Sequence, residues 1–282
     1  MRILMANVAA AEEDSEDGRF FKTVAVELWR RSFDLVKQPD TEIVFRFPRR
    51  GLTALEGEMY SYLHHLAAGE IFHAVVQAER DGFDGALIAC FHDPMLWEAR
   101  QAVDIPVVGF GESSLVLAAM MGRKFGVVTI SPYSIHDTEE NIVKYGFMDR
   151  CVGVRCIFES GLEQEKAMGD AHGTIEVFKT AARELIAEGA EVIIPGCGLM
   201  APTLRFAPGA EAEYPHGLTE VDGVPIADVY GNAIKCLETL VSLKKAGSCW
   251  ISRKGLYAGA SAEAIEASRM VLDYEGPGFW DC

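Results

Sequence analysis

Two cysteines stand at corresponding positions in this chain, each at the end of an apolar run that is typical of a buried strand. Cys90 closes the run 85–90, and Cys197 follows the run 191–195, 107 residues further on. Open α/β folds bind their ligands at the carboxyl ends of parallel strands. Two thiols in that position suggest an acid/base site that acts on a substrate from two sides.

The residues after Cys90 predict a helix start. In the segment Cys90-Phe91-His92-Asp93-Pro94, we expect Asp93 to cap a helix that begins at Pro94, because proline fits the first helical turn and Asp accepts hydrogen bonds from unpaired amides. The Cys90 thiol would then lie just ahead of a positive helix end, which favours the thiolate.

The surroundings of Cys197 predict a similar arrangement. Gly196 and Gly198 flank the thiol, and glycine permits close backbone approach and leaves amides able to face a developing oxyanion. Pro202 is expected to open the helix that follows. The other five cysteines lack such a context, and we interpret them as packing or surface residues: Cys151, Cys156, Cys236, Cys249 and Cys282.

Composition narrows the function classes. The 282 residues carry 26 Lys and Arg against 42 Asp and Glu, a formal charge of −16, so nucleic acid and anionic membranes are not expected partners. No run approaches the roughly 20 apolar residues of a membrane span, and the first residues do not resemble a signal peptide. An odd number of cysteines without a CxxC pair favours reduced thiols. We therefore expect a cytoplasmic protein.

Strand-like runs alternate with helical stretches, as in βαβ units with a parallel sheet. The expected strands are Arg2–Val8, Glu42–Phe47, Gly85–Cys90, Pro106–Gly109, Lys124–Ile130, Cys151–Ile157 and Glu191–Pro195. The expected helices are Gly18–Val36, Glu58–Arg80 with a break at Gly69, Pro132–Tyr145, His172–Glu188 and Asp228–Ala246.

The second half of this pattern echoes the first, so the predicted fold is α/β with two similar flavodoxin-like lobes. Each lobe has a mostly four-stranded parallel sheet flanked by helices, and the site lies in the cleft between them. We expect residues 1–112 and 226–246 to form the first lobe and 113–225 the second. Residues 247–282 form a C-terminal extension, for which a role in packing or oligomer contacts is the simplest interpretation.

An ordered set of motifs resembles the aspartate/glutamate/hydantoin racemase superfamily, and most of all its hydantoin and allantoin racemase branch. The resemblance extends over about residues 1–246. The motifs are Cys90-Phe91-His92-Asp93-Pro94, Ile105-Pro106-Val107-Val108-Gly109-Phe110-Gly111-Glu112, Phe125-Gly126-Val127-Val128-Thr129 and Pro195-Gly196-Cys197-Gly198-Leu199-Met200.

This resemblance implies a cofactor-independent enzyme in which an acidic carbon sits between two thiols. Cys90 and Cys197 would be the catalytic residues, one removing a proton as thiolate and the other returning one as thiol. The backbone amides after Cys90 and Cys197 and the Thr129 hydroxyl are candidates to stabilise the enolate, and Asn7 matches the first Asn of the family's Asn-Pro-Asn turn. The implied substrate-binding residues are Asn7, Phe91, His92, Thr129, Gly196 and Gly198.

The chain departs from the family pattern at two places that bear on the substrate. The first turn continues as Val8-Ala9-Ala10, without the Pro and second Asn, and His92 replaces the glycine that this branch tends to have. Arginines near the expected site, Arg49, Arg50 and Arg205, leave a carboxylate-bearing substrate open. His64, His65 and His73 have no ordered ligand spacing, so no metal is predicted.

The leading hypothesis is a racemase of a small cyclic ureide or amide, such as a 5-substituted hydantoin or allantoin. One alternative is an isomerase, amino-acid racemase or decarboxylase on the same scaffold that acts on a small dicarboxylate. Another is a small-molecule binding protein without chemistry. A small-molecule substrate and assembly into a homo-oligomer are expected.

Overall fold

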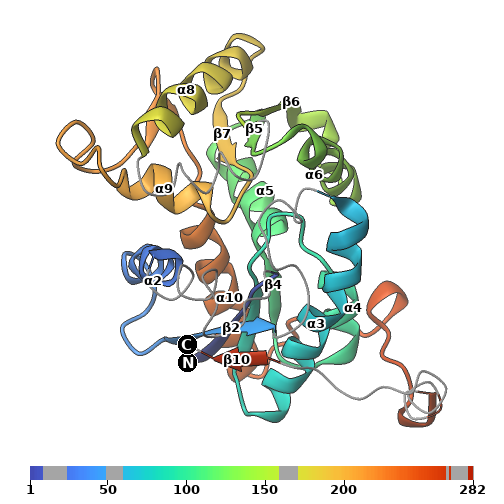
Figure 1. The fold of residues 1–282 in the computed structure, drawn as a ribbon. Helices are drawn as coiled ribbons and strands as arrows, with labels where there is room; N and C mark the ends of the chain where they lie inside the picture. Colours follow the sequence, from blue (N-terminus) through green and yellow to red (C-terminus); the bar gives the residue numbers. More distant parts are fainter. Residues whose placement is uncertain (9–23, 49–59, 159–170, 265–266, 268–278, 282) are drawn as a thin grey trace.

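The computed structural model describes residues 1–8, 24–48, 60–158, 171–264, 267 and 279–281, and shows two α/β lobes stacked one above the other (Figure 1). Each lobe is built on parallel strands with helices on both faces, which confirms the predicted fold class. None of the helices in these ranges is long and apolar enough to cross a membrane.

The first lobe contains a five-stranded sheet in the order β10-β2-β1-β3-β4, in which only β10 runs antiparallel to its neighbour. Its strands are β1 (Arg2–Ala6), β2 (Glu42–Pro48), β3 (Gly85–Ile88), β4 (Val107–Gly109) and β10 (Phe279–Asp281). Its helices are α2 (Val26–Asp34), α3 (Ser61–Arg80), α4 (Leu96–Ala102) and α10 (Val229–Lys245).

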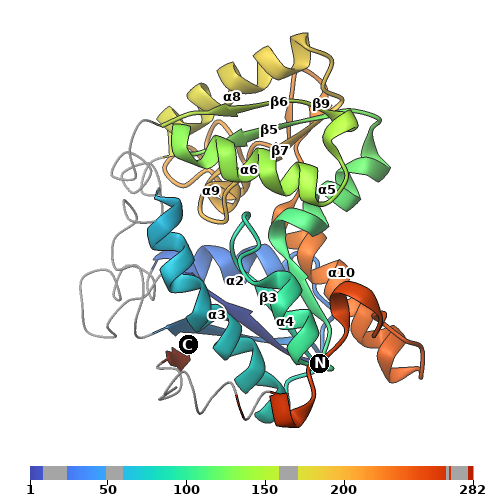
Figure 2. The same ribbon diagram turned by 90° about the vertical axis from the view of Figure 1, so that its right-hand side faces the viewer.

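Both faces of this sheet are buried, as the continuous apolar strands require. Alternate residues of β1 point to opposite faces: Ile3 and Met5 pack in the cluster that contains α2 and α10, and Leu4 and Ala6 pack in the one that contains α3 and α4. Figure 2 shows α3 and α4 on one side of the strands, with α2 behind them. The carboxyl ends of the strands point toward the second lobe.

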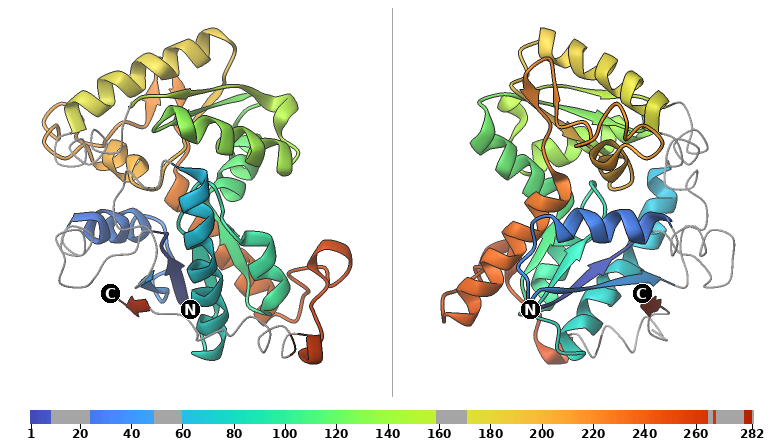
Figure 3. Two further views of the ribbon diagram at one scale, coloured as in Figure 1. Left: turned by 45° about the vertical axis from the view of Figure 1, so that its right-hand side comes forward. Right: turned by 90° about the vertical axis from the view of Figure 1, so that its left-hand side faces the viewer.

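The second lobe has the strand order β6-β5-β7, with a further parallel bridge between Ile193 and Ile226. Helices α5 and α6 cover one face and α8 the other (Figure 3). Its elements are α5 (Phe110–Met121), β5 (Phe125–Thr129), α6 (Pro132–Lys144), η3 (Met148–Arg150), β6 (Cys151–Cys156), α8 (Ala171–Ala187), β7 (Val192–Pro195), α9 (Met200–Phe206), β8 (Glu220–Val221) and β9 (Val224–Pro225).

Two helices join the lobes. Helix α5 leads from β4 of the first sheet to β5 of the second, and α10 returns the chain to the first lobe and packs along α5. Beyond α10, Arg253 donates hydrogen bonds to the carbonyls of Arg100 and Val103, and the short helix η4 (Gly255–Tyr257) lies against α4. The C-terminal extension therefore contributes to the first lobe, both at α4 and as the edge strand β10.

Most predicted elements appear within one or two residues of their expected bounds, and the part of the first expected helix before residue 24 lies outside the described residues. The predicted break at Gly69 is wrong, since α3 is continuous from Ser61 to Arg80. Burial of Ile71, Val75 and their neighbours outweighs the cost of about 1 kcal/mol that a glycine imposes within a helix.

Candidate active site

One pocket between the lobes contains both cysteines. It lies at the carboxyl ends of β1 and β3 on one side and of β5 and β7 on the other, where open α/β sheets bind ligands. It is lined by Asn7, Val8, Trp29, His64, Ala89, Cys90, Phe91, His92, Ile130, Ser134, Gly196, Cys197, Gly198, Leu199 and Tyr230. The structure therefore brings together every predicted site residue except Thr129.

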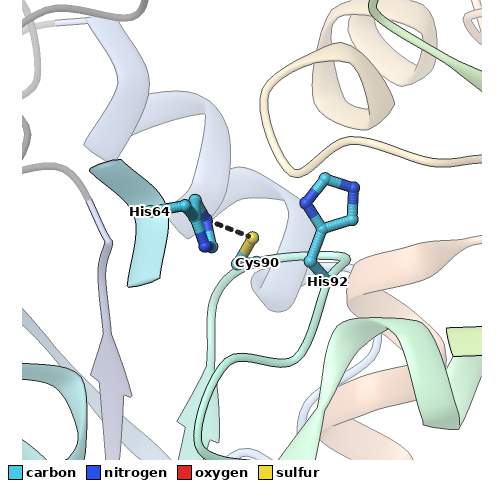
Figure 4. A group of neighbouring side chains, drawn as sticks. All are labelled: His64, Cys90 and His92. Atoms are coloured by element: carbon cyan, nitrogen blue, oxygen red, sulfur yellow. Dashed lines mark hydrogen bonds between the residues drawn. The ribbon is translucent and has the colours of Figure 1, made fainter. Parts of the chain in front are cut away.

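Cys90 has a histidine neighbour that the sequence analysis did not assign to the site. His64 Nε2 lies 3.5 Å from Cys90 Sγ, and the two side chains point toward each other (Figure 4). His64 belongs to the first turn of α3, the helix that follows β2. Burial lowers the pKa of His64 below its usual value, so the ring is neutral at neutral pH and one nitrogen accepts while the other donates.

His92 lies beside this pair, with its ring 5.8 Å from the ring of His64. Its Nδ1 is 3.9 Å from a carboxylate oxygen of Asp137 on α6, and the Ser61 hydroxyl donates to the same carboxylate. Burial and the neighbouring His64 lower the pKa of His92 to about 4. Cys90, His64 and His92 of the first lobe and Asp137 of the second thus lie together at this edge of the pocket.

Asp93 does not cap a helix at Pro94, which corrects the sequence prediction. Helix α4 begins only at Leu96, after Met95 in the left-handed conformation. The Asp93 carboxylate instead accepts the Gly111 and Glu112 amides at 2.9 and 2.6 Å, at the start of α5. Cys90 therefore does not lie just ahead of a helix N-terminus.

The buried Asp93 carboxylate also accepts the Tyr145 hydroxyl at 2.9 Å. Burial raises the pKa of Asp93 to about 7. A Cβ at Gly109 would approach Asp93 Oδ1 within 2.1 Å, and one at Gly111 would approach the Phe91 carbonyl within 2.2 Å. The turn that carries Cys90, Phe91 and His92 is thereby fixed against α5.

Cys197 follows β7 and is buried, with 9% of its surface exposed. The amide of Leu199 donates to its sulfur at 3.4 Å, a contact that favours the thiolate. Helix α9 begins at Met200, so Pro202 lies inside its first turn rather than at its start.

The two glycines beside Cys197 differ in what they provide. The Gly196 amide donates to the Val128 carbonyl at 2.7 Å, so it is already paired and does not face an oxyanion, contrary to the prediction. A Cβ at Gly196 would contact Val127 at 2.9 Å, whereas Gly198 has ordinary room for one. Only Gly196 needs to be glycine for packing.

Tyr230, at the start of α10, holds the Cys197 turn. Its hydroxyl donates to the Gly198 carbonyl at 2.6 Å, and its ring packs edge-on against Phe33 and Phe110. Burial, together with the nearby Cys197, raises the pKa of Tyr230 well above its usual value, so the hydroxyl remains protonated.

The remaining predicted residues fall at different depths. Asn7 and Phe91 line the pocket, and the Asn7 side-chain amide reaches the Arg46 carbonyl at 3.4 Å. Thr129 is completely buried at the end of β5 and is not among the residues that line the pocket. Ile130 and Ser134, further along the chain, line the wall there instead.

The described wall of the pocket carries no Asp, Glu, Lys or Arg. Arg205, which the sequence analysis offered as a carboxylate partner, is directed away and donates to the His216 carbonyl at 2.5 Å. Arg49 and Arg50 lie outside the described residues. The walls that the structure describes suit a neutral ligand.

Each of the two α/β lobes contributes one cysteine to the shared pocket. The chain belongs to the Asp/Glu/Hydantoin racemase family, whose model matches residues 29–229. It is therefore an isomerase of the racemase class, and the alternative of a binding protein without chemistry is not retained.

Named relatives agree with this assignment. The chain is 33% identical over 207 residues to the hydantoin racemase of Pseudomonas sp. (strain NS671), which covers 73% of this chain and 76% of the relative. Among solved structures it is similar to allantoin racemase from Klebsiella pneumoniae, with a TM-score of 0.72, 25% identity and coverage of 96% and 98% of the two chains. Allantoin racemase from Pseudomonas fluorescens gives a TM-score of 0.69 at 27% identity, with coverage of 92% and 97%.

Proposed function

We propose that this enzyme racemises a small, neutral cyclic ureide, such as a 5-substituted hydantoin or allantoin, with Cys90 and Cys197 as its acid/base pair. The observation that carries the proposal is that both thiols line one pocket whose described wall has no charged side chain. The named hydantoin and allantoin racemases among its relatives support the same substrate class.

The reaction needs one proton to leave the stereocentre and another to arrive on its opposite face. One cysteine, as thiolate, takes the proton from carbon, and the electron pair moves into the adjacent carbonyl to give an enolate. The other cysteine, as thiol, donates its proton to the opposite face of that carbon, and the carbonyl re-forms. The protonation states of Cys90 and Cys197 are then exchanged, so the free enzyme is ready for the reverse enantiomer.

The neighbours of the thiols suit these two states. A neutral His64 serves Cys90 in either state, since its Nε2 accepts from the thiol in one tautomer and donates to the thiolate in the other. The Leu199 amide only donates, and so stabilises Cys197 as thiolate.

A neutral substrate is favoured over a dicarboxylate by the cost of burying charge. A carboxylate that enters a pocket without a cationic partner loses its hydration and gains no ion pair. Because Arg205 is directed elsewhere, the described wall offers no such partner. The dicarboxylate alternative would have to rely on amide and hydroxyl donors, or on cations from residues outside the described ranges.

The test is to incubate single enantiomers of 5-substituted hydantoins, allantoin, aspartate, glutamate and an arylmalonate in deuterium oxide, and to follow optical rotation and proton NMR together. We expect loss of rotation, with deuterium at the stereocentre, for the ureides alone. Racemisation of aspartate or glutamate, or loss of carbon dioxide from the arylmalonate, would overturn the substrate assignment.

A cytoplasmic location and a homo-oligomeric assembly remain predictions, to be checked by cell fractionation and light scattering.

A further inference from the structure

We propose that His64, Cys90 and His92 form a Zn²⁺ site at the edge of the pocket, and that an ion bound there switches the racemase off. The ligand atoms of these three side chains all lie within 4.8 Å of one another (Figure 4). The binding site stands on this geometry alone, whereas its inhibitory effect rests on the proposed role of Cys90.

The spacing is close to that of a zinc site. Tetrahedral Zn²⁺ with bonds of about 2.0–2.3 Å to nitrogen and sulfur holds its ligand atoms roughly 3.3–3.6 Å apart. His64 Nε2 and Cys90 Sγ are already 3.5 Å apart. The ring of His92 therefore needs to move by only about 1 Å, which a rotation about its side-chain bonds supplies.

The ligand chemistry selects the metal. One thiolate and two imidazoles are soft and borderline donors that suit Zn²⁺, while Mg²⁺ and Ca²⁺ require oxygen ligands. All three side chains line the pocket, so the fourth coordination position faces solvent or substrate. An ion thus has an entry path through the mouth of the pocket itself.

The surroundings support a bound cation. Asp137 lies 3.9 Å from His92 Nδ1 and accepts a hydrogen bond from the Ser61 hydroxyl, so a negative charge is fixed close to the three ligands. The described pocket wall carries no Lys or Arg to repel the ion. Cys90 and His92 share one turn that Asp93 fixes to α5, so the site is held in place by the fold.

Zinc binding would remove Cys90 from catalysis in both directions. The Cys90 thiol loses its proton to solvent as the Zn–S bond forms, and the sulfur lone pair is then held by the ion. The bound sulfur neither accepts a proton from carbon nor has one to return. Chelation by EDTA withdraws the ion, and protonation of the released thiolate restores the active pair.

Metal binding is tested on the Cys197→Ala variant, which keeps all three ligands and lacks one proposed catalytic thiol. We expect it to bind one Zn²⁺ per chain by equilibrium dialysis, and Co²⁺ to give a thiolate-to-cobalt charge-transfer band in the near ultraviolet. Zn²⁺ should also protect Cys90, but not Cys249, from iodoacetamide, as read by peptide mass spectrometry. A Co²⁺ spectrum without the thiolate band, or equal labelling of Cys90 with and without Zn²⁺, would overturn the site.

The ligands are tested by His64→Asn, His92→Ser and Asp137→Asn, each checked for folding by circular dichroism. Zn²⁺ affinity should fall about tenfold or more in the two ligand variants, and by less in Asp137→Asn, which removes only a neighbouring negative charge. The control is His136→Ser, which changes an exposed histidine on the same helix as Asp137. If His136→Ser weakens Zn²⁺ binding as much as His92→Ser does, the ion binds elsewhere and the proposal is wrong.

Activity of the wild-type enzyme separates the two proposals. We expect stoichiometric Zn²⁺ to inhibit racemisation at least tenfold, with recovery on addition of EDTA. Tight Zn²⁺ binding that leaves racemisation unchanged would refute the switch. Absence of Zn²⁺ binding in an enzyme that loses racemisation on Cys90→Ala would refute the metal site and leave the two-cysteine proposal standing.

Discussion

The two thiols of the site have different polar neighbours, and this difference is the main feature at the scale of single residues. Cys90 faces an imidazole that adapts to either protonation state, and Cys197 faces a backbone amide that only donates. Side chains that hold these neighbours in place affect turnover without touching substrate carbon. Tyr230 is the most direct example, because it binds the carbonyl next to Cys197.

Tyr230→Phe removes the hydroxyl that donates to the Gly198 carbonyl. We expect kcat to fall about tenfold, because one lost hydrogen bond costs roughly 1–1.5 kcal/mol and loosens the Cys197 turn, while KM changes little. Steady-state kinetics with a hydantoin enantiomer measures both. Tyr62→Phe, at an exposed tyrosine, is the control, and an unchanged kcat in Tyr230→Phe would contradict the positioning role.

At the scale of elements, the turn after β3 is joined to α5 through Asp93. Asp93→Asn replaces a carboxylate that accepts two amides and one hydroxyl with an amide that has a single acceptor oxygen. We expect a loss of about 1–3 kcal/mol in the free energy of unfolding, because buried donors are left unpaired. Urea unfolding measures this against the exposed-site control Asp149→Asn. Equal stability of the two variants would contradict the account.

Helix α10 is tied to the segment before β2 by a buried glutamate. Glu238 is 1% exposed and accepts the Gln38 amide and the Thr41 hydroxyl, each at 2.7 Å. Burial alone would raise the pKa of Glu238, but hydrogen bonds to its carboxylate, from Lys235 first, lower it below the ordinary 4.5. The carboxylate therefore stabilises the fold above that value, and this contribution is lost as the pH falls through the lowered pKa.

Glu238→Gln should consequently reduce the free energy of unfolding by about 1–3 kcal/mol at pH 7, and by less in acid below about pH 4. Urea unfolding at the two pH values measures the difference from wild type. Glu211→Gln, at an exposed site, serves as control and should have little effect. If the loss of free energy of unfolding in Glu238→Gln, relative to wild type, grows as the pH falls, the lowered pKa of Glu238 is contradicted.

Helices and strands were predictable where the sequence pattern that determines them is local. The apolar runs that end near Cys90 and Cys197 gave the strands and the position of the pocket. Asp93 was misassigned because its partners lie 18 and 19 residues further along the chain, and no local pattern reports such a contact. Tyr230 enters the pocket from a helix that crosses between lobes, which only the tertiary fold reveals.

The sequence contains a weak indication that His64 lies near the site. The first turn of a helix that follows a parallel strand lies at the carboxyl edge of the sheet, so a histidine there is near the site. In the sequence, the nearest histidines to His64 are His65 and His73 on the same predicted helix, and these have no ligand spacing. The fold instead groups His64 with Cys90 and His92, 26 and 28 residues away.

At the scale of the whole molecule, residues of α3 and α6 link the two lobes near His92. Ser61 of α3 donates a hydrogen bond to Asp137 of α6, and the rings of Tyr60 and Tyr133 lie tilted against each other with their centroids 5.4 Å apart. The lobes are also joined at the back by α5 and α10. We expect the assembled pocket to select substrates through its described wall, which carries no Asp, Glu, Lys or Arg.

We expect this selection to appear as a difference in kcat/KM of at least a hundredfold, about 3 kcal/mol, between a neutral 5-substituted hydantoin and aspartate or glutamate. The measurement is racemisation followed by polarimetry at matched concentrations. Hydantoins that carry a carboxylate on the 5-substituent test the same point within one scaffold. Equal kcat/KM for charged and neutral substrates would contradict a neutral pocket.

In the proposed mechanism, Cys90 and Cys197 share the acid/base chemistry. The racemisation rates of Cys90→Ala and Cys197→Ala, measured side by side with wild type, test this. We expect each variant to lose at least about a thousandfold in kcat, because acid/base groups contribute 10² to 10⁴ and one face of the carbon is left without its group. Circular dichroism verifies that both variants fold. Racemisation near the wild-type rate in either variant would contradict the account.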